Sequence, residues 1–413
     1  MNNPPCPNRR SLLTAGLLAT LALAACSATP GQEVSGAGAV LDLPFSTTPN
    51  TAEAAAASQR LAWELIGNLD EPNRVVSPSS LAMSLVMAGE GAVGSSEQSI
   101  AEALGLSGDD RSRAFGALRQ SLLDYDSLPK KVDAKKPPET PVVHQASRAL
   151  VLDEEIKQDF LDRIKTYYDA SATQAERAGA KADLDAWART HTAGLIEKSG
   201  IDITGDTVLV LQDALLFAAA WADPFDGEIT MPFHGTDGTK DVEGLADTFW
   251  IPVVSGENWS AIRLPYDDVL AADVILPKEG VAPESLTVED LDAATRELAR
   301  TPADHPETIV QLPSFDLTSK VDLLAGLPGI DLEHLDGIID LGYAAQWIQQ
   351  VRLQVTAEGT VGAALTEMAV EAGSAPMESP TEFIVDRPFV FRVIDTRTGW
   401  PLFLATIADP SAD

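Results

Sequence analysis

The chain has 413 residues, of which 45% are hydrophobic, and its formal net charge is −33, from 62 acidic and 29 basic side chains. This length and apolar content allow a large buried core and exclude global disorder. The excess of carboxylates repels phosphate backbones, so binding to nucleic acids is disfavoured. Self-repulsion on a soluble surface is the simplest interpretation of such a charge.

The N-terminus has the pattern of a processing signal. Arg9 and Arg10 precede a mostly apolar stretch, 12–25, which is too short to span a membrane comfortably and suits a signal peptide. The stretch ends in small residues directly before Cys26, a pattern that resembles a bacterial lipobox, in which the cysteine thiol takes a lipid. We expect residues 1–25 to be a lipoprotein signal peptide and Cys26 to be the lipid attachment site. The protein would then be exported and lipid-anchored to the cell envelope, or extracellular. An ordinary signal peptide followed by a chance cysteine is the alternative.

The remaining chain divides into a tether and one domain. Cys6 leaves with the signal, so no thiol remains for a disulfide or a metal site. Residues 26–50 are rich in Ser, Thr, Gly, Pro and Ala and predict a flexible tether, followed by a single domain over 51–413. The one internal break is a Pro- and Lys-rich segment, for which a solvated loop is favoured over a glycan or partner contact; its lysines are Lys130, Lys131, Lys135 and Lys136.

The first predicted elements are helices. Apolar spacing predicts a helix over 54–69. Ser77 followed by Pro78 is typical of a helix start, with serine as the N-cap and proline in the first helical position. The helix that follows, 81–89, is apolar on nearly every side and is expected to be buried all round.

Further along the chain, helical patterns give way to strands. Helices are predicted over 156–168 and 180–196. The apolar run 207–211 predicts a central strand covered on both faces. Later strands are expected at 273–276, 309–312, 352–355, 389–394 and 402–407, the last two joined by a turn at 395–399. Helices early and strands late indicate an α+β fold.

Enzyme motifs find little support. Residues 89–94 match GxGxxG literally, but a predicted helix precedes them instead of the strand that a nucleotide site requires. No GxSxG elbow and no phosphate-binding loop is present, so a hydrolase has no supporting residues. The five histidines have no metal-ligand spacing and are expected to be surface or packing residues: His144, His191, His234, His305 and His334. We expect no catalytic residues, no metal and no cofactor.

Seven segments carry a resemblance to a known family. They are 73–81 (NRVVSPSSL), 209–225 (LVLQDALLFAAAWADPF), 264–266 (LPY), 274–277 (VILP), 312–315 (LPSF), 387–391 (RPFVF) and 399–404 (GWPLFL). Each is weak alone, but together they follow the order of the serpin family over nearly the whole mature domain. The resemblance implies the serpin fold, with a large, mostly antiparallel central sheet, surrounding helices and an exposed reactive loop, here about 357–386.

The proposed hinge of that loop has a strand-like pattern. Residues 357–366 (AEGTVGAALT) resemble the serpin hinge, and its candidate residues are Gly359, Thr360, Val361, Gly362, Ala363 and Ala364. Alternate side chains of a strand share a face. One face, starting at Thr360 and continuing to Val370, is uncharged throughout; the other, starting at Val361, includes two glutamates. The first face is expected to be buried on insertion and the second solvated.

The resemblance implies a suicide-substrate mechanism. In serpins a serine protease cuts the loop, and the freed loop enters the sheet as a new strand and traps the acyl-enzyme. Family spacing from the hinge favours cleavage at Gly373–Ser374, and spacing back from Pro388 favours Met377–Glu378 as a second choice. No Lys or Arg lies between Arg352 and Arg387, so an elastase-like or subtilisin-like serine protease is expected and a trypsin-like one is not. The protein is expected to act as a monomer.

One alternative function and one further region remain. A serpin scaffold whose loop never inserts would act as a non-inhibitory binding module at the cell surface. By resemblance, the region that controls sheet opening includes Asn73, Ser77, Ser80, Asp213 and Gln349. Asp213 stands where the family tends to have asparagine, and Gln349 where it tends to have histidine. A hydrogen bond between these two side chains is expected to replace the usual one.

Overall fold

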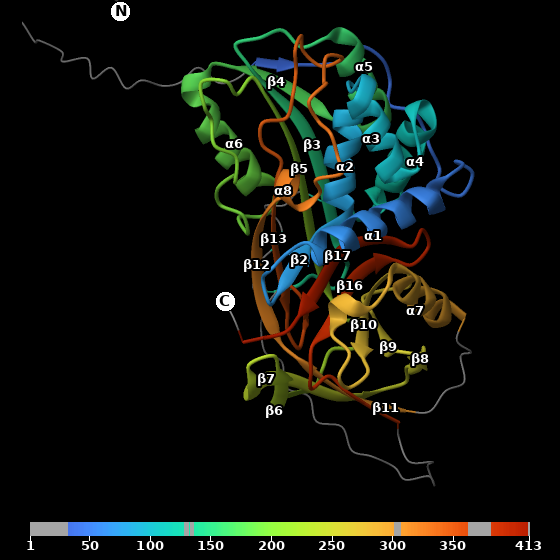
Figure 1. The fold of residues 1–413 in the computed structure, drawn as a ribbon. Coiled ribbons are helices and arrows are strands. Elements are labelled where there is room, and N and C mark those ends of the chain that lie inside the picture. The colour runs from blue at the N-terminus through green and yellow to red at the C-terminus, as the bar shows by residue number, and fades with distance from the viewer. Residues whose placement is uncertain (1–31, 128–131, 133–135, 301–306, 362–380, 412–413) are drawn as a thin grey trace, which may run out of the picture.

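The structure is a computed structural model that describes residues 32–127, 132, 136–300, 307–361 and 381–411 (Figure 1). Its largest sheet has the order β1-β4-β3-β5-β14-β13-β12, and every neighbouring pair is antiparallel except β3 and β4. In that order the strands are Gln32–Val34, Ser171–Ala175, Val142–Leu152, Leu209–Ala220, Gly359–Thr360, Ile348–Val355 and Phe315–Asp322. The expected large, mostly antiparallel sheet is confirmed.

The described residues also form two smaller sheets. The six-stranded sheet has the order β2-β17-β16-β10-β9-β8, with bounds Arg74–Val76, Trp400–Ile407, Phe389–Asp395, Leu270–Pro277, Trp259–Pro265 and Val254–Ser255. The four-stranded sheet has the order β15-β11-β7-β6, with bounds Thr381–Ile384, Thr308–Pro313, Gly238–Phe249 and Gly227–Gly235. The mixture of separate helices and largely antiparallel sheets confirms the α+β class.

Helices surround the sheets. The helices of the described residues are α1 (Thr51–Gly67), α2 (Pro78–Gly89), α3 (Gly94–Leu104), α4 (Gly108–Ser121), α5 (Gln158–Tyr168), α6 (Arg177–His191), α7 (Val288–Arg300) and the short α8 (Leu323–Gly326). Of these, α2, α5 and α6 contact strands of the largest sheet, and α1 and α7 contact strands of the six-stranded sheet. Figure 1 shows α2 and α6 on opposite sides of β3 and β5. Among the described residues, no helix combines the length and apolar character needed to cross a bilayer.

The start of α2 follows from its sequence. The Ser77 side chain accepts a hydrogen bond from the Ser80 backbone N–H (3.3 Å), and Pro78 occupies the first turn, where its missing N–H costs nothing. Every residue of the helix except Ser84 is buried, as expected for a segment that is apolar all round. The GxGxxG match lies between α2 and α3, so it is a turn between helices, as expected.

Most predicted boundaries shift by a few residues, and the largest shifts are in α6 and β5. The helix predicted over 180–196 ends at His191, because the Thr192 hydroxyl bonds the Ala188 carbonyl (2.8 Å) and accepts the Ile196 N–H (3.0 Å). The strand predicted over 207–211 begins at Leu209 and continues to Ala220. Its burial alternates over the first half, so the expectation that it is covered on both faces is wrong there.

The expected flexible tether is wrong for residues 32–50. β1 pairs antiparallel with the edge strand β4, and the backbone N–H of Leu41 donates to the Thr166 carbonyl (2.9 Å). Leu43 is buried in the main core, with its N–H donating to the Gln120 side chain (2.8 Å). Pairing to an open sheet edge and burial of a leucine hold this segment on the domain. Residues 26–31, Cys26 and the signal segment lie outside the described residues.

A buried charge network joins the six-stranded sheet to two helices. Asp273 of β10 is fully buried between Arg392 of β16 (2.5 Å) and Arg263 of β9 (2.7 Å). Arg392 also donates to Gln59 of α1 (2.5 Å) and to Thr295 of α7 (2.8 Å). These two arginines hold the pKa of Asp273 below its usual range against the opposing effect of burial.

Candidate functional site

The largest sheet is split along its middle. β14 pairs with β5 through Gly359 and Ala220 and through Thr360 and Ala219, and with β13 through Thr360 and Val355. No other strand pairing joins β5 to β13 within the described part of the sheet. Beyond this two-residue bridge, the facing edges of β5 and β13 therefore lack the ladder that a neighbouring strand would supply.

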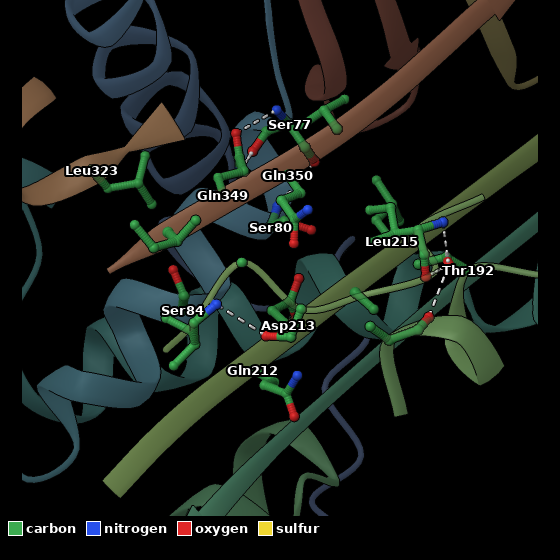
Figure 2. A pocket seen from close by; sticks show the side chains of 18 of the residues that line it. Ser77, Ser80, Ser84, Thr192, Gln212, Asp213, Leu215, Leu323, Gln349 and Gln350 are labelled. Carbon is green, nitrogen blue, oxygen red and sulfur yellow. Dashed lines mark hydrogen bonds between the residues drawn. The ribbon is translucent and has the colours of Figure 1, made fainter. Parts of the chain in front are cut away.

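A cavity of about 110 Å³ lies between these two strands (Figure 2). Its walls come from β5, β13, the start of α2 and the segment after α6, and they include Ser77, Ser80, Thr192, Asp213, Gln349 and Phe403. Leu211, Asp213 and Leu215 are half-buried and line it, which explains why β5 is not covered on both faces. Four of the five residues expected to control sheet opening thus meet at one cavity.

Gln349 ties β13 to the start of α2. Its Nε2 donates to the Ser77 carbonyl (2.9 Å), and its Oε1 accepts the Ser77 N–H (3.0 Å), as Figure 2 shows. The Ser77 hydroxyl donates in turn to the Leu402 carbonyl of β17 (2.8 Å). Buried hydrogen bonds of this kind contribute roughly 1 kcal/mol each and cost more when one partner is left unsatisfied. The pair fixes β13 on its side of the cavity.

Asp213 belongs to the other side of the cavity. The Ser147 hydroxyl donates to its Oδ2 (2.6 Å) and Gln145 donates to its Oδ1 (3.4 Å), both from β3. Burial raises the pKa of Asp213 to about 6, although hydrogen bonds from Ser147, Ser80 and Gln145 and the charge of Arg119 oppose the rise. The expected hydrogen bond between Asp213 and Gln349 is wrong for this structure. Asp213 bonds side chains of β3, whereas Gln349 bonds the backbone of Ser77.

Asn73 lies away from this cavity. Its Oδ1 accepts the backbone N–H groups of Ala408 and Asp409 (2.9 Å each), and its Nδ2 donates to the Asp409 carbonyl (2.6 Å). The side chain therefore holds the chain end after β17, and its expected place beside the opening of the sheet is wrong. Its three hydrogen bonds are all to backbone, which sequence spacing does not reveal.

The residues expected to begin the reactive loop contact a pair of stacked aromatic side chains. Thr360 is 1% exposed, and its hydroxyl lies 2.5 Å from the Tyr266 hydroxyl. Tyr266 stacks on Trp221, with ring centroids 4.6 Å apart. Trp221 donates from its backbone to the Glu358 carbonyl (2.9 Å) and from its indole to the Thr356 carbonyl (3.0 Å). The resemblance pointed to both aromatic segments, but not to this contact between Tyr266 and the hinge.

Gly359 is required by close approach. A Cβ at this position would lie 2.2 Å from the Ala219 carbonyl oxygen and 2.7 Å from the Ala220 Cα, both in the backbone of β5. Neither atom can move without shifting the strand, so a side chain here is incompatible with β14.

Val361 follows the last paired residue of β14. It is 6% exposed and its N–H donates to the Gln354 carbonyl (3.1 Å). The face that it would present in an inserted strand stays a prediction. Its φ of 108° turns the chain out of the strand, so the alternation of faces stops there. Gly362, Ala363 and Ala364, and both candidate bonds, Gly373–Ser374 and Met377–Glu378, lie outside the described residues. The chain is described again from β15, which belongs to a different sheet.

Two of the histidines that were expected to be surface or packing residues lie together. His144 of β3 and His191 of α6 are joined Nε2 to Nδ1 (2.8 Å), with rings stacked 5.2 Å apart. His144 also bonds Asp126 (2.6 Å), and Trp187 packs on His191 at 4.4 Å. Burial, and then the charges of His144 and Arg148, lower the pKa of His191 to about 4. No sequence signal links the two, because they are far apart in the chain and meet only through helix-on-sheet packing. The described residues contain no set of three side chains arranged as metal ligands.

Comparisons with known proteins agree with this architecture. A family model described as Serpin (serine protease inhibitor) matches residues 53–410. An uncharacterized serpin-like protein of Thermococcus kodakarensis is 27% identical over 367 residues, covering 84% of this chain and 82% of the relative. Plasminogen activator inhibitor 1 of Neovison vison is 28% identical over 370 residues, covering 82% and 87%. The crystal structure of a thermophilic serpin, tengpin, in the native state superposes with a TM-score of 0.76 at 20% identity, covering 92% and 99%. Since the family model spans most of the sequence, this chain belongs to the serpin family.

Proposed function

We propose that this protein inhibits a serine protease as a suicide substrate, by inserting its cleaved loop between β5 and β13. The observation that carries the proposal is β14. Its two residues already pair with both strands and mark the first rungs of the strand that would fill the split. A loop cut beyond residue 361 would continue from these rungs along two strand edges that have no other partner between them.

Insertion sets the entropy cost of ordering the loop against new ladder bonds and apolar burial, which must exceed it. Ordering about a dozen residues costs on the order of 12–24 kcal/mol of backbone entropy. Each inserted residue gains ladder hydrogen bonds, at roughly 1 kcal/mol each, to a strand on one side or the other. Side chains on the inward face add burial at about 25 cal/mol per Å² of apolar surface. Because that face, from Thr360 to Val370, carries no charge, insertion meets no unpaired buried ion.

The chemistry of the loop defines the target class. With no Lys or Arg between Arg352 and Arg387, a pocket built for a basic residue finds no partner in the loop. The target is therefore an elastase-like or subtilisin-like serine protease, with Gly373–Ser374 as the first candidate bond and Met377–Glu378 as the second. The inhibitor acts as a monomer.

The test is incubation with subtilisin, pancreatic elastase and trypsin. The expected result is a complex with one of the first two that survives boiling in SDS, and none with trypsin. Mass spectrometry of the released fragment identifies the bond. Clean cleavage without complex, and a melting temperature unchanged by cleavage, would instead support a non-inhibitory binding module at the cell surface.

The proposal includes a location. The signal pattern over 1–25 and the lipobox-like residues before Cys26 support export and lipid anchoring to the cell envelope. Labelled fatty acid is expected to enter the expressed parent protein, and a Cys26→Ser variant is expected to remain unlabelled. Labelling of the variant would refute the anchor at Cys26.

A further inference from the structure

One face of the four-stranded sheet adjoins the point where the loop ends. In this sheet β15, β11 and β7 are neighbours, and their register aligns Thr381 with Thr308 and Thr308 with Phe249. Strands lie about 4.8 Å apart, so the backbone of Phe249 is roughly 10 Å from that of Thr381. Trp250 follows Phe249 directly, at the edge of the sheet where the chain enters β15.

Trp250 is unusually exposed for its type. Its exposed fraction is 68%, whereas Phe249 and Thr308 in the preceding row are buried. Tryptophan is the side chain that loses most by facing water, and it is enriched among the residues that dominate protein interfaces. A single exposed apolar residue needs no explanation by itself. Trp250 is of interest because it lies beside the start of β15, where the loop ends.

The neighbouring side chains define a surface of mixed character. One residue further into the sheet, the register aligns Thr248, Ile309 and Glu382, and none of these three is buried. Glu307 comes directly before Thr308, at the same end of the sheet as Trp250. Trp250, Ile309, Glu307 and Glu382 are here called the Trp250 face. It combines apolar area with two carboxylates. A partner that matches it has an apolar patch bordered by basic residues.

The occupant follows from the position of the loop. The two candidate bonds end three and seven residues before Thr381, so at about 3.3 Å per residue they lie within roughly 10 and 23 Å of it along the chain. A standard interface buries about 800 Å² on each partner, which corresponds to a patch roughly 30 Å across. A protease bound at either bond is therefore large enough to reach the Trp250 face while it holds the loop.

We propose that the Trp250 face is a docking surface for the target protease, which it contacts beside the entrance to the protease active site. This inference rests on the proposed function, because it assumes that a protease binds the loop. Docking there raises the rate at which the loop is attacked and selects proteases with a basic rim. It does not alter what happens after cleavage, because the face belongs to a sheet that the inserting strand does not enter.

The test measures the second-order rate constant with which subtilisin consumes the intact protein, counting trapped complex and cleaved product together. Trp250→Ala is expected to lower this constant about 30-fold, the effect of losing a hot-spot side chain. Glu382→Lys is expected to lower the constant for a protease with a basic rim several-fold at low salt, with the difference lost in 1 M salt.

Matched controls come from the far end of the largest sheet. Tyr343 is an aromatic residue with 50% exposure, and Glu154 is an exposed acid, so Tyr343→Ala and Glu154→Lys are expected to leave the constant within twofold of the parent. A Trp250→Ala constant within twofold of the parent, or an equal loss with Tyr343→Ala, overturns the docking surface. If the parent is cleaved without complex, the proposed inhibition fails, while the ratio of Trp250→Ala to parent still decides the docking surface. Where subtilisin does not attack the parent, pancreatic elastase takes its place in the assay; if neither protease cleaves or binds the parent, both proposals fall.

Discussion

Replacing Thr360 by arginine is expected to convert the inhibitor into a substrate. Thr360 is 1% exposed and its hydroxyl contacts the Tyr266 hydroxyl at 2.5 Å, so the native site is small and uncharged. An arginine there either buries a guanidinium beside Tyr266 or pushes β14 out from between its two neighbours. The first outcome costs several kcal/mol for an unpaired buried charge. The second loses the Thr360–Tyr266 bond and the ladder bonds of β14, at roughly 1 kcal/mol each.

Either route adds about 3 kcal/mol to the barrier for insertion, which slows insertion about 100-fold. Hydrolysis of the acyl-enzyme competes with insertion and is unaffected by the change, so nearly all molecules are cleaved and released. Titration of subtilisin with the variant measures this as a rise in the number of inhibitor molecules consumed per protease inactivated. The SDS-stable complex is expected to disappear while cleaved protein accumulates at the parental rate.

Thr360→Ser is the matched control, because it keeps the hydroxyl that meets Tyr266 and adds no charge. It is expected to trap the protease nearly as well as the parent. If Thr360→Arg inhibits with parental stoichiometry, the residues after Glu358 do not enter the sheet as a strand, and the account of insertion given above is wrong.

The remaining predictions concern stability, measured as urea unfolding midpoints, with the exposed Asp237→Asn as a control expected to change little. The pKa of Asp213, about 6, lies above its ordinary value, so folding favours the protonated carboxyl group. The stability that this group contributes is complete below about pH 4 and is lost as the pH rises through 6. Asp213→Asn should therefore stabilise the protein at pH 8 by at most about 3 kcal/mol, and an unchanged midpoint there would refute this. The pKa of His191, about 4, lies below its ordinary value, so its contribution is complete above about pH 6.5 and is lost as pH falls through 4. His191→Gln should reduce the loss of stability on acidification by at most about 3 kcal/mol, and an equal acid loss in parent and variant would contradict it. Asp273→Ala leaves the buried Arg392 and the half-buried Arg263 without their carboxylate and should destabilise the protein by about 3–5 kcal/mol at pH 7; a loss below 1 kcal/mol would mean that water or other groups satisfy them.

Local patterns of sequence determined several elements correctly. The N-cap at Ser77, proline in the next position and an apolar run predicted both the start of α2 and its complete burial, because capping and helical periodicity depend on residues only a few positions apart. The resemblance also pointed to four residues that line the cavity, Ser77, Ser80, Asp213 and Gln349. The sequence thus indicated which residues meet at the cavity, but not which hydrogen bonds they form.

The bonds depend on which strands become neighbours. Asp213 binds Ser147 and Gln349 binds Ser77, because pairing of β5 with β3 and packing of β13 on α2 offer each a nearer partner than the other. Composition predicted a flexible tether, yet residues 32–34 pair with β4. An open strand edge can pair with the backbone of another segment regardless of that segment's side chains.

The sequence by itself determined the family, the α+β class, the capped and buried helix α2 and the uncharged face that begins at Thr360. Only the tertiary structure decided that β14 bridges a split sheet, that His144 meets His191 and that Trp250 stands exposed beside the base of the loop. The first set follows from periodicities and motifs within short segments. The second set joins residues tens to hundreds of positions apart, where sheet register and packing determine the neighbours and a pattern read along the chain does not.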